Sequence, residues 1–175
     1  MSGVLKAEDI WYNKLMDITT LFNSQDIDIV LKLFVALLLG MSLGVERAIA
    51  GKTAGMRTYG LVTMGSALFV IVGIFSSSGY GSTTTVFTDS SARITAAIIQ
   101  GIGFIGAGLI FFKGEKVSGV TTAAGIWVSA GVGIAIGYGF FMLAVITTIF
   151  ALFVFTSLWY IENKIKSFAH FSPED

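Results

Sequence analysis

Eight charged or amide side chains lie inside or at the ends of long apolar stretches, and they are the residues best placed to do chemistry. On insertion scales a charged side chain at a bilayer centre costs about 2.5–3.5 kcal/mol, so each one needs a reason. Carboxylates among them could help to hold a cation, and an amide could contact a ligand or line a pore. The candidates are Asp28, Lys32, Glu46, Arg47, Arg57, Asp89, Arg93 and Gln100.

Each candidate also has a purely structural interpretation. Asp28 and Lys32 are four residues apart, which fits an ion pair reaching toward the membrane surface, or half of an outer polar cluster with Asp89 and Arg93. Glu46, Arg47 and Arg57 could anchor helix ends; alternatively, Glu46 pairs with one of the two arginines and lines an inner vestibule. Gln100 could form one interhelical hydrogen bond, with Ser129, Thr63 or Ser66 as acceptor or donor, or it could face a pore or ligand.

The stretch "GIGFIGAG" at 101–108 contains the G-x-G-x-x-G pattern of a dinucleotide-binding loop. That loop needs a strand before it, a helix after it, and an acidic residue about 20 positions later. Here the flanks "AAIIQ" and "LIFF" are apolar, and the acidic residue that follows is Glu115. We therefore interpret these glycines as packing residues and not as a nucleotide site.

Composition narrows the function classes. Hydrophobic residues make up 54% of the chain and charged residues 13%, with a mean hydropathy of +0.82. The chain has no cysteine, and its one histidine, His170, lies near the end, so thiolate sites and histidine-rich zinc sites are excluded within one chain. The net charge is zero, which gives no reason to expect a nucleic-acid partner. We expect no cofactor and no enzymatic activity.

Five apolar stretches are long enough to cross a bilayer as helices. We expect an all-α integral membrane protein with a short amphipathic surface helix over 1–26, a five-helix transmembrane domain over 27–161, and a cytoplasmic tail over 162–175. The predicted spans are 27–45, 56–75, 93–112, 119–137 and 139–161.

Lysine and arginine residues set the predicted orientation. Seven of the eleven fall in the two loops and the tail that share one side of such a bundle, and four fall on the other side. We therefore expect the N-terminus outside and the C-terminus in the cytoplasm.

Small residues recur at helical spacing, and they allow transmembrane helices to approach closely. We expect the first four spans to form a tight bundle and the fifth, which has no glycine after Gly139, to lie outside it. Exposed small-residue faces also favour a homodimer, with the fourth span as a first candidate contact. The expected packing residues are Gly40, Gly44, Gly101, Gly103, Gly106, Gly108, Gly125, Ser129, Gly133 and Gly137.

Two blocks of the sequence resemble the MgtC/SapB family of membrane proteins. The stretch "LLGMSLGVERAIAGKTAGMRTYGLVTMGSALFV", 38–70, is similar to the first block of that family, and "RITAAIIQGIGFIGAGLIFFKGEKVSGVTTAAGIWVSAGVGIAIGYG", 93–139, to the second. The chain looks like the short SapB/YhiD type, without the cytoplasmic C-terminal domain of longer members.

The resemblance carries expectations about residues and role. It places Asp28, Lys32, Glu46 and Arg47 in the family's first span and Arg57 in its inner loop, while Asp89 and Arg93 are four apart where three is expected. It implies a bacterial cytoplasmic-membrane protein connected with magnesium limitation. We expect a regulatory or accessory protein that binds other membrane proteins; the alternative is a small transporter or channel for Mg²⁺ or another cation.

Overall fold

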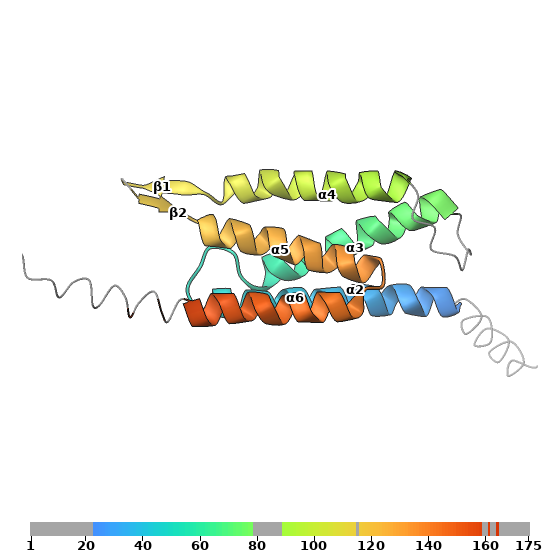
Figure 1. Ribbon diagram of the computed structural model, residues 1–175, viewed down its shortest axis with the longest axis horizontal. Helices are drawn as coiled ribbons and strands as arrows, with labels where there is room; N and C mark the ends of the chain where they lie inside the picture. The colour runs from blue at the N-terminus through green and yellow to red at the C-terminus, as the bar shows by residue number, and fades with distance from the viewer. Residues whose placement is uncertain (1–22, 79–88, 115, 159–160, 162–163, 165–175) are drawn as a thin grey trace, which may run out of the picture. The chain divides into compact units, whose positions relative to one another are not determined.

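The computed structural model describes residues 23–78, 89–114, 116–158, 161 and 164. Within them lie five α-helices, which Figure 1 shows with the two short strands that precede α5. The chain divides into two compact units, 1–31 and 32–175, with the boundary inside the first described helix. The predicted surface helix and tail lie almost wholly outside the described residues. The helices are α2 (Ser24–Ile49), α3 (Met56–Ser78), α4 (Asp89–Gly108), α5 (Val120–Gly137) and α6 (Phe141–Phe153), which continues as the π-helix η1 (Val154–Leu158).

The chain is a multi-pass membrane protein built from these helices. Among the described residues, α2, α3 and α5 are long and apolar enough to cross a bilayer. They correspond to the spans predicted at 27–45, 56–75 and 119–137. The helix α4 is not among them because Arg93, Gln100 and its glycines lower its hydropathy, and α6 is a shorter apolar helix. Five crossings and the predicted orientation therefore stay predictions.

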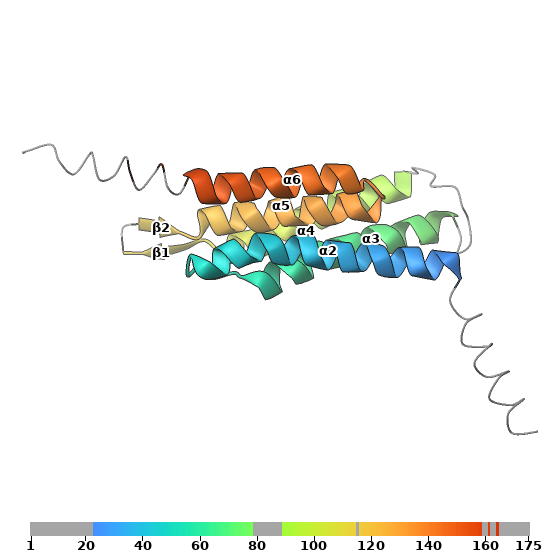
Figure 2. The same cartoon turned by 90° about the horizontal axis from the view of Figure 1, so that it is seen from below.

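Within the second unit, α5 is the central element. It packs against α3, α4 and α6, as the two views in Figures 1 and 2 show. Its small residues face α3: a methyl group built at Gly133 would overlap the carbonyl oxygen of Thr63, and one at Gly137 would lie 2.7 Å from the Val70 side chain. Such close approach is what small residues permit in lipid. Gly125, Ser129, Gly133 and Gly137, which the sequence predicts to pack, are all buried.

The same contact principle joins α2 to α3. Gly40 lies against Thr63 and Tyr59, and Gly44 lies against the backbone at Met56. Both glycines are buried, as predicted. The small residues Gly133 and Gly137 of α5 likewise contact α3 of the same chain, and the expected homodimer stays a prediction.

The prediction that the fifth span lies outside the bundle is wrong. Ala144 on α6 is fully buried in a cluster with Ala36, Ala67 and Ile136. Phe155 on η1 joins a second cluster around Leu43, Tyr59 and Ile126. The fifth span packs without glycine because alanine and threonine occupy its inner face, while its large side chains point outward.

The helix predicted over 93–112 ends early. The chain leaves the helix after Gly108 and forms a hairpin of β1 (Phe111–Lys113) and β2 (Lys116–Ser118), with Phe111 paired to Ser118 and Lys113 to Lys116. Gly114, with a φ of +66°, begins the turn between the strands. The fold is therefore helical with one small hairpin, and not purely α.

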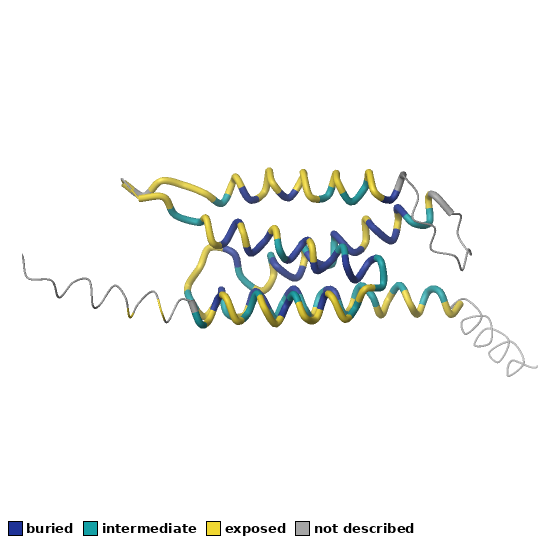
Figure 3. The backbone as a smooth tube through the Cα atoms, in the orientation of Figure 1, coloured by how far each residue is buried: buried dark blue, intermediate teal, exposed yellow. Residues whose placement is uncertain are grey.

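The packing glycines predicted in α4 divide into two groups. Gly106 contacts Ala123 of α5, but added side chains at Gly101, Gly103 and Gly108 would meet nothing within 4 Å. These three glycines make no close contact within the described part of this chain, so their packing role stays a prediction. Figure 3 shows the consequence, since α4 is largely exposed where α5 is largely buried.

Candidate functional site

A buried arginine marks the end of α2. Arg47 is only 3% exposed, and its Nε donates to Glu46, which confirms one of the two predicted partners of that carboxylate. The guanidinium lies over the Phe155 ring, with its carbon 4.0 Å from the ring centroid. Arg57, the other predicted partner, is exposed on the first turn of α3. The stacking of the Arg47 guanidinium on the Phe155 ring therefore joins the end of α2 to η1.

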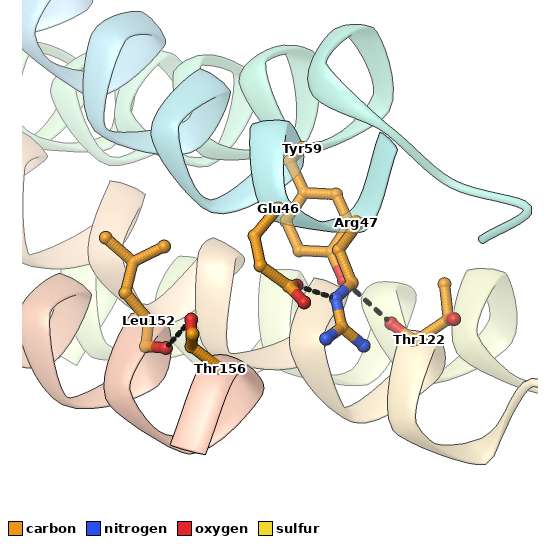
Figure 4. Close-up of polar contacts among 6 residues, drawn as sticks. All are labelled: Glu46, Arg47, Tyr59, Thr122, Leu152 and Thr156. Atoms are coloured by element: carbon orange, nitrogen blue, oxygen red, sulfur yellow. Dashed lines mark hydrogen bonds and ion pairs between the residues drawn. The ribbon is translucent and has the colours of Figure 1, made fainter. Parts of the chain in front are cut away.

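The edge of the Phe155 ring lies against α5. A methyl group at Gly125 would overlap the Tyr59 hydroxyl and lie 2.7 Å from the Phe155 ring. Tyr59 is fully buried and donates to the Thr122 carbonyl at 3.3 Å, as Figure 4 shows. The π-helical turn η1 carries Phe155, and such turns are common at functional sites.

Beside this cluster is a pocket of 580 Å³, which we call the α2–α5 pocket. The loop after α2 reaches it through a helix-ending turn in which Lys52 N–H donates to Arg47 C=O and Gly51 N–H to Ala48 C=O. Gly51 has a φ of +64°, which a larger residue would adopt at a cost. Residues that line the pocket include Arg47, Lys52, Thr53, Ser118, Thr121 and Phe155.

The start of α5 forms the opposite wall of this pocket. Gly119 caps the helix with a φ of 90° and gives no side-chain hydrogen bond. Any side chain there would collide with the Leu109 carbonyl, so glycine is required and the helix start stays uncapped. The first helical bond runs from Ala123 N–H to Gly119 C=O, which leaves the three preceding N–H groups without an intrahelical acceptor.

A second polar cluster joins the other ends of α4 and α5. The Tyr138 hydroxyl lies 2.7 Å from Thr95 Oγ1 and donates to the Ser91 carbonyl at 3.0 Å. These bonds tie the α5–α6 turn to the first turns of α4. One bond joins two side chains and the other joins a side chain to the backbone, which fits a structural role.

The remaining sequence candidates are scattered. Arg93 is exposed on α4, and Asp89 begins that helix. Asp28 belongs to the first unit and Lys32 to the second, so the predicted outer cluster stays a prediction. Gln100 is exposed, and neither Thr63 nor Ser129 bonds to it, because both hydroxyls donate to carbonyls of their own helices. Among the described residues, no group of three His, Cys, Asp or Glu side chains could hold a metal ion.

Sequence reasoning did not identify Phe155, Tyr59 or the start of α5 as parts of this site. Phe155 lies among many other aromatic residues of the fifth span, and its spacing carries no distinguishing signal. One signal was present: Gly119 directly before "VTTAAG" leaves a helix start with no Ser, Thr, Asp or Asn at the capping position.

Comparisons with known proteins agree on one family. The sequence model of the MgtC family matches residues 33–164. The chain is 40% identical over 127 residues to "Putative magnesium transporter YhiD" of Escherichia coli K12, which covers 73% of this chain and 59% of that protein. It is 42% identical over 123 residues to "Protein MgtC" of Salmonella typhimurium LT2, which covers 70% of this chain and 49% of MgtC.

A Haemophilus influenzae protein of uncharacterised function is 38% identical over 141 residues, or 80% of this chain and 59% of its own length. The chain thus spans between half and three fifths of the length of these relatives. No solved structure matches it. The two blocks that carry the resemblance lie within the matched region, and residues of both blocks line the α2–α5 pocket. Because the family model matches residues 33–164, the chain belongs to the MgtC family.

Proposed function

We propose that this chain is a regulatory or accessory protein of the bacterial cytoplasmic membrane, without enzymatic activity, that binds a transmembrane helix of another membrane protein. The binding surface is the outer face of α4, which we define as Ala96, Gln100, Gly103, Phe104 and Ala107. All five residues are exposed, and they recur at helical spacing. The chain is oriented with its C-terminus in the cytoplasm.

One observation carries this proposal: Gln100 presents its amide on an exposed helix face between small residues. No described residue hydrogen-bonds to this amide, which has two donors and an acceptor. In hydrocarbon such a group gains about 0.6–2 kcal/mol from a partner on a neighbouring helix. Gly103 and Ala107 would let the backbone of that helix approach closely.

The groove next to this face adds room for a partner. A cavity of 750 Å³ lies between α3 and α4, and it is lined by apolar residues such as Leu61, Phe69 and Ile98. Gly65 and Gly101 on its walls would meet nothing within 4 Å if they carried a methyl group. A helix side chain could enter there without displacing the core.

The link to magnesium comes from the relatives. One is named "Putative magnesium transporter YhiD" and another "Protein MgtC". We propose that this chain acts in magnesium limitation or ion homeostasis by binding its partner, and that it moves no ion itself. The buried hydroxyls of Thr63, Ser129 and Thr148 support this proposal, because each donates to a carbonyl of its own helix.

The proposal is tested by site-specific photo-crosslinking in cells grown in low magnesium. A photoreactive residue replaces Phe104 on the outer face of α4, which is 84% exposed, and the control replaces Phe150 on α6, which is 65% exposed. We expect one membrane protein, identified by mass spectrometry, to be captured at position 104 and not at 150. Gln100→Leu should weaken the capture several-fold.

Other outcomes have definite meanings. An adduct of twice the chain mass would show that the face binds a second copy, as in the homodimer expected from the sequence. Equal capture at both positions would refute the outer face of α4 as a specific surface.

A second candidate function, transport of Mg²⁺ or another cation, is favoured by the name of the E. coli relative. Purified protein in liposomes with a magnesium-sensitive dye inside distinguishes the two. Magnesium entry that depends on Glu46, and is lost in Glu46→Gln, would support transport and overturn the regulatory proposal.

A further inference from the structure

The α2–α5 pocket contains hydrogen-bond donors that the fold does not use. Arginine carries five N–H donors, and the single N–H on Nε of Arg47 is directed to Glu46. The four donors on its two terminal nitrogens bond to no described residue. Figure 4 shows these nitrogens pointing away from Glu46, toward the space between η1 and α5. Arg47 lines the pocket although its side chain is only 4% exposed.

Burying a charge in this way is expensive. The terminal nitrogens of Arg47 are not among the fully buried, unpartnered side-chain atoms of the described residues, so they keep contact with the pocket, where a bound group could replace the hydration that the guanidinium has lost. Phe155 holds the guanidinium plane from one side and Glu46 holds its Nε edge, so the outer edge is fixed in place. An arginine that is positioned but unsatisfied is prepared to receive a planar or tetrahedral oxyanion in bidentate geometry.

The opposite wall supplies donors of a second kind. The N–H groups of Val120, Thr121 and Thr122 precede the first intrahelical bond of α5, and Gly119 provides no capping side chain. A helix start carries the equivalent of about +0.5 charge and binds anions through these groups. Val120, Thr121 and Thr122 all line the pocket. The residues that carry the two sets of donors, on α2 and on α5, therefore line the same pocket of 580 Å³.

The charge balance of the pocket is positive. Glu46 offsets one positive charge, and Arg47, Lys52 and the helix start together leave about +1.5. Lys52 is exposed at the mouth, where it can attract an anion from solution or from the membrane surface. This arrangement repels Mg²⁺ and favours an anion.

We propose that the α2–α5 pocket binds a phosphate group, as a free phosphate, a soluble phosphate ester or the headgroup of an anionic lipid. Phosphate fits because it has several oxygen acceptors, which can bond to the Arg47 edge and to the start of α5 together. The pocket lies at the ends of membrane-spanning helices, at the level where lipid headgroups also lie. This site is separate from the outer face of α4 and does not depend on the proposed function.

The test uses the full chain, purified in a neutral detergent. Inorganic phosphate is titrated into the protein by calorimetry, with sodium chloride at matched ionic strength as a reference. In parallel, the protein is placed in nanodiscs of phosphatidylcholine with increasing phosphatidic acid or phosphatidylglycerol, and bound lipid is counted by native mass spectrometry. The first arm detects free phosphate and the second detects a lipid headgroup.

Three variants give the result its meaning. Arg47→Gln removes the buried charge and should weaken binding at least about tenfold, which is typical of losing a hydrogen bond to a charged group. Lys52→Gln removes an exposed charge at the mouth, so the chain folds even if Arg47→Gln does not, and binding should fall about two- to fivefold. Arg57→Gln is the matched control, because Arg57 is an exposed cation on the same loop side that does not line the pocket.

Saturable phosphate binding that Lys52→Gln weakens and Arg57→Gln does not would support a site for free phosphate. The same pattern seen only with anionic lipid would support a headgroup site. Absence of binding in both arms, or equal loss in Lys52→Gln and Arg57→Gln, would overturn the proposal, since the effect would then be general surface charge.

Discussion

Gly133→Ala tests whether α3 and α5 are held together by close approach of their backbones. The added methyl group would overlap the Thr63 carbonyl oxygen and lie 2.9 Å from both the Thr63 carbonyl carbon and Ser66 Cβ. Ordinary van der Waals contacts of a methyl carbon begin at 3.4 Å, so the two helices must move apart by at least the difference between 2.9 Å and 3.4 Å. The atoms in the way are backbone, or are fixed to it, and cannot rotate aside.

The loss of stability follows from the separation of the two helices. A gap of about 0.5 Å between packed surfaces forfeits a quarter or more of their dispersion attraction. Overpacking of a tight core usually costs about 1–3 kcal/mol. For a chain of this size that corresponds to a fall in Tm of about 2–12 °C.

Gly131→Ala is the matched control. Gly131 is on the same helix, two residues away, and a methyl group there would meet nothing within 4 Å. Alanine favours a helix over glycine by up to about 1 kcal/mol, so this variant should be unchanged or slightly more stable.

The assay is thermal unfolding of both variants in one detergent, followed by tryptophan fluorescence and by recovery of a monodisperse peak on size exclusion. We expect Gly133→Ala to unfold well below the wild type and Gly131→Ala to match it. If the two variants unfold at the same temperature, close packing of α3 on α5 is not what holds the second unit together.

Three further predictions address the site, the opposite end of the bundle and the orientation. Phe155→Leu removes the ring under the guanidinium and should lower stability by about 1–2 kcal/mol, measured by thermal unfolding, whereas Phe153→Leu on the exposed side should change it little. Tyr138→Phe removes one hydroxyl that joins the α5–α6 turn to α4 and should cost about 0.5–1.5 kcal/mol in the same assay; an unchanged Tm would mean that these hydrogen bonds contribute nothing. Because the chain has no cysteine, Lys52→Cys and Ser76→Cys can be labelled singly in intact cells with an impermeant maleimide. Ser76→Cys should react from outside and Lys52→Cys only after the inner membrane is opened, and the reverse pattern would invert the orientation.

Spacing predicted the packing of α5 because the constraint is local. Gly125, Ser129, Gly133 and Gly137 fall on one helix face whatever surrounds them, and in lipid such a face is used for helix contact. The same reasoning does not say which helix Gly101, Gly103 and Gly108 pack against, because spacing alone does not reveal whether the neighbouring helix belongs to the same chain. The prediction that the fifth span lies outside the bundle failed for a related reason. Ala144 and Thr148 are small enough to pack against other helices, although this helix contains no glycine.

The candidate site was predicted in part. Glu46 and Arg47 stood out because charge at the end of an apolar helix needs an explanation, and their pairing was one of the expected alternatives. Whether Glu46 pairs with Arg47 on α2 or with Arg57 on α3 depends on which arginine side chain is buried, and tertiary contacts decide that. The stacking on Phe155 joins residues more than a hundred positions apart, which no local pattern specifies.

The packing of the helices and the chemistry of the pocket depend on the same contact. Because Gly125 has no side chain, the Tyr59 hydroxyl and the Phe155 ring fit against α5, and Phe155 in turn carries the guanidinium of Arg47. The position of the guanidinium in the pocket therefore depends on the missing methyl group at Gly125, which lets the edge of the Phe155 ring lie against α5. The close helix contacts would then serve two purposes in this chain, since they stabilise the bundle in lipid and hold a cation still where an anion could meet it.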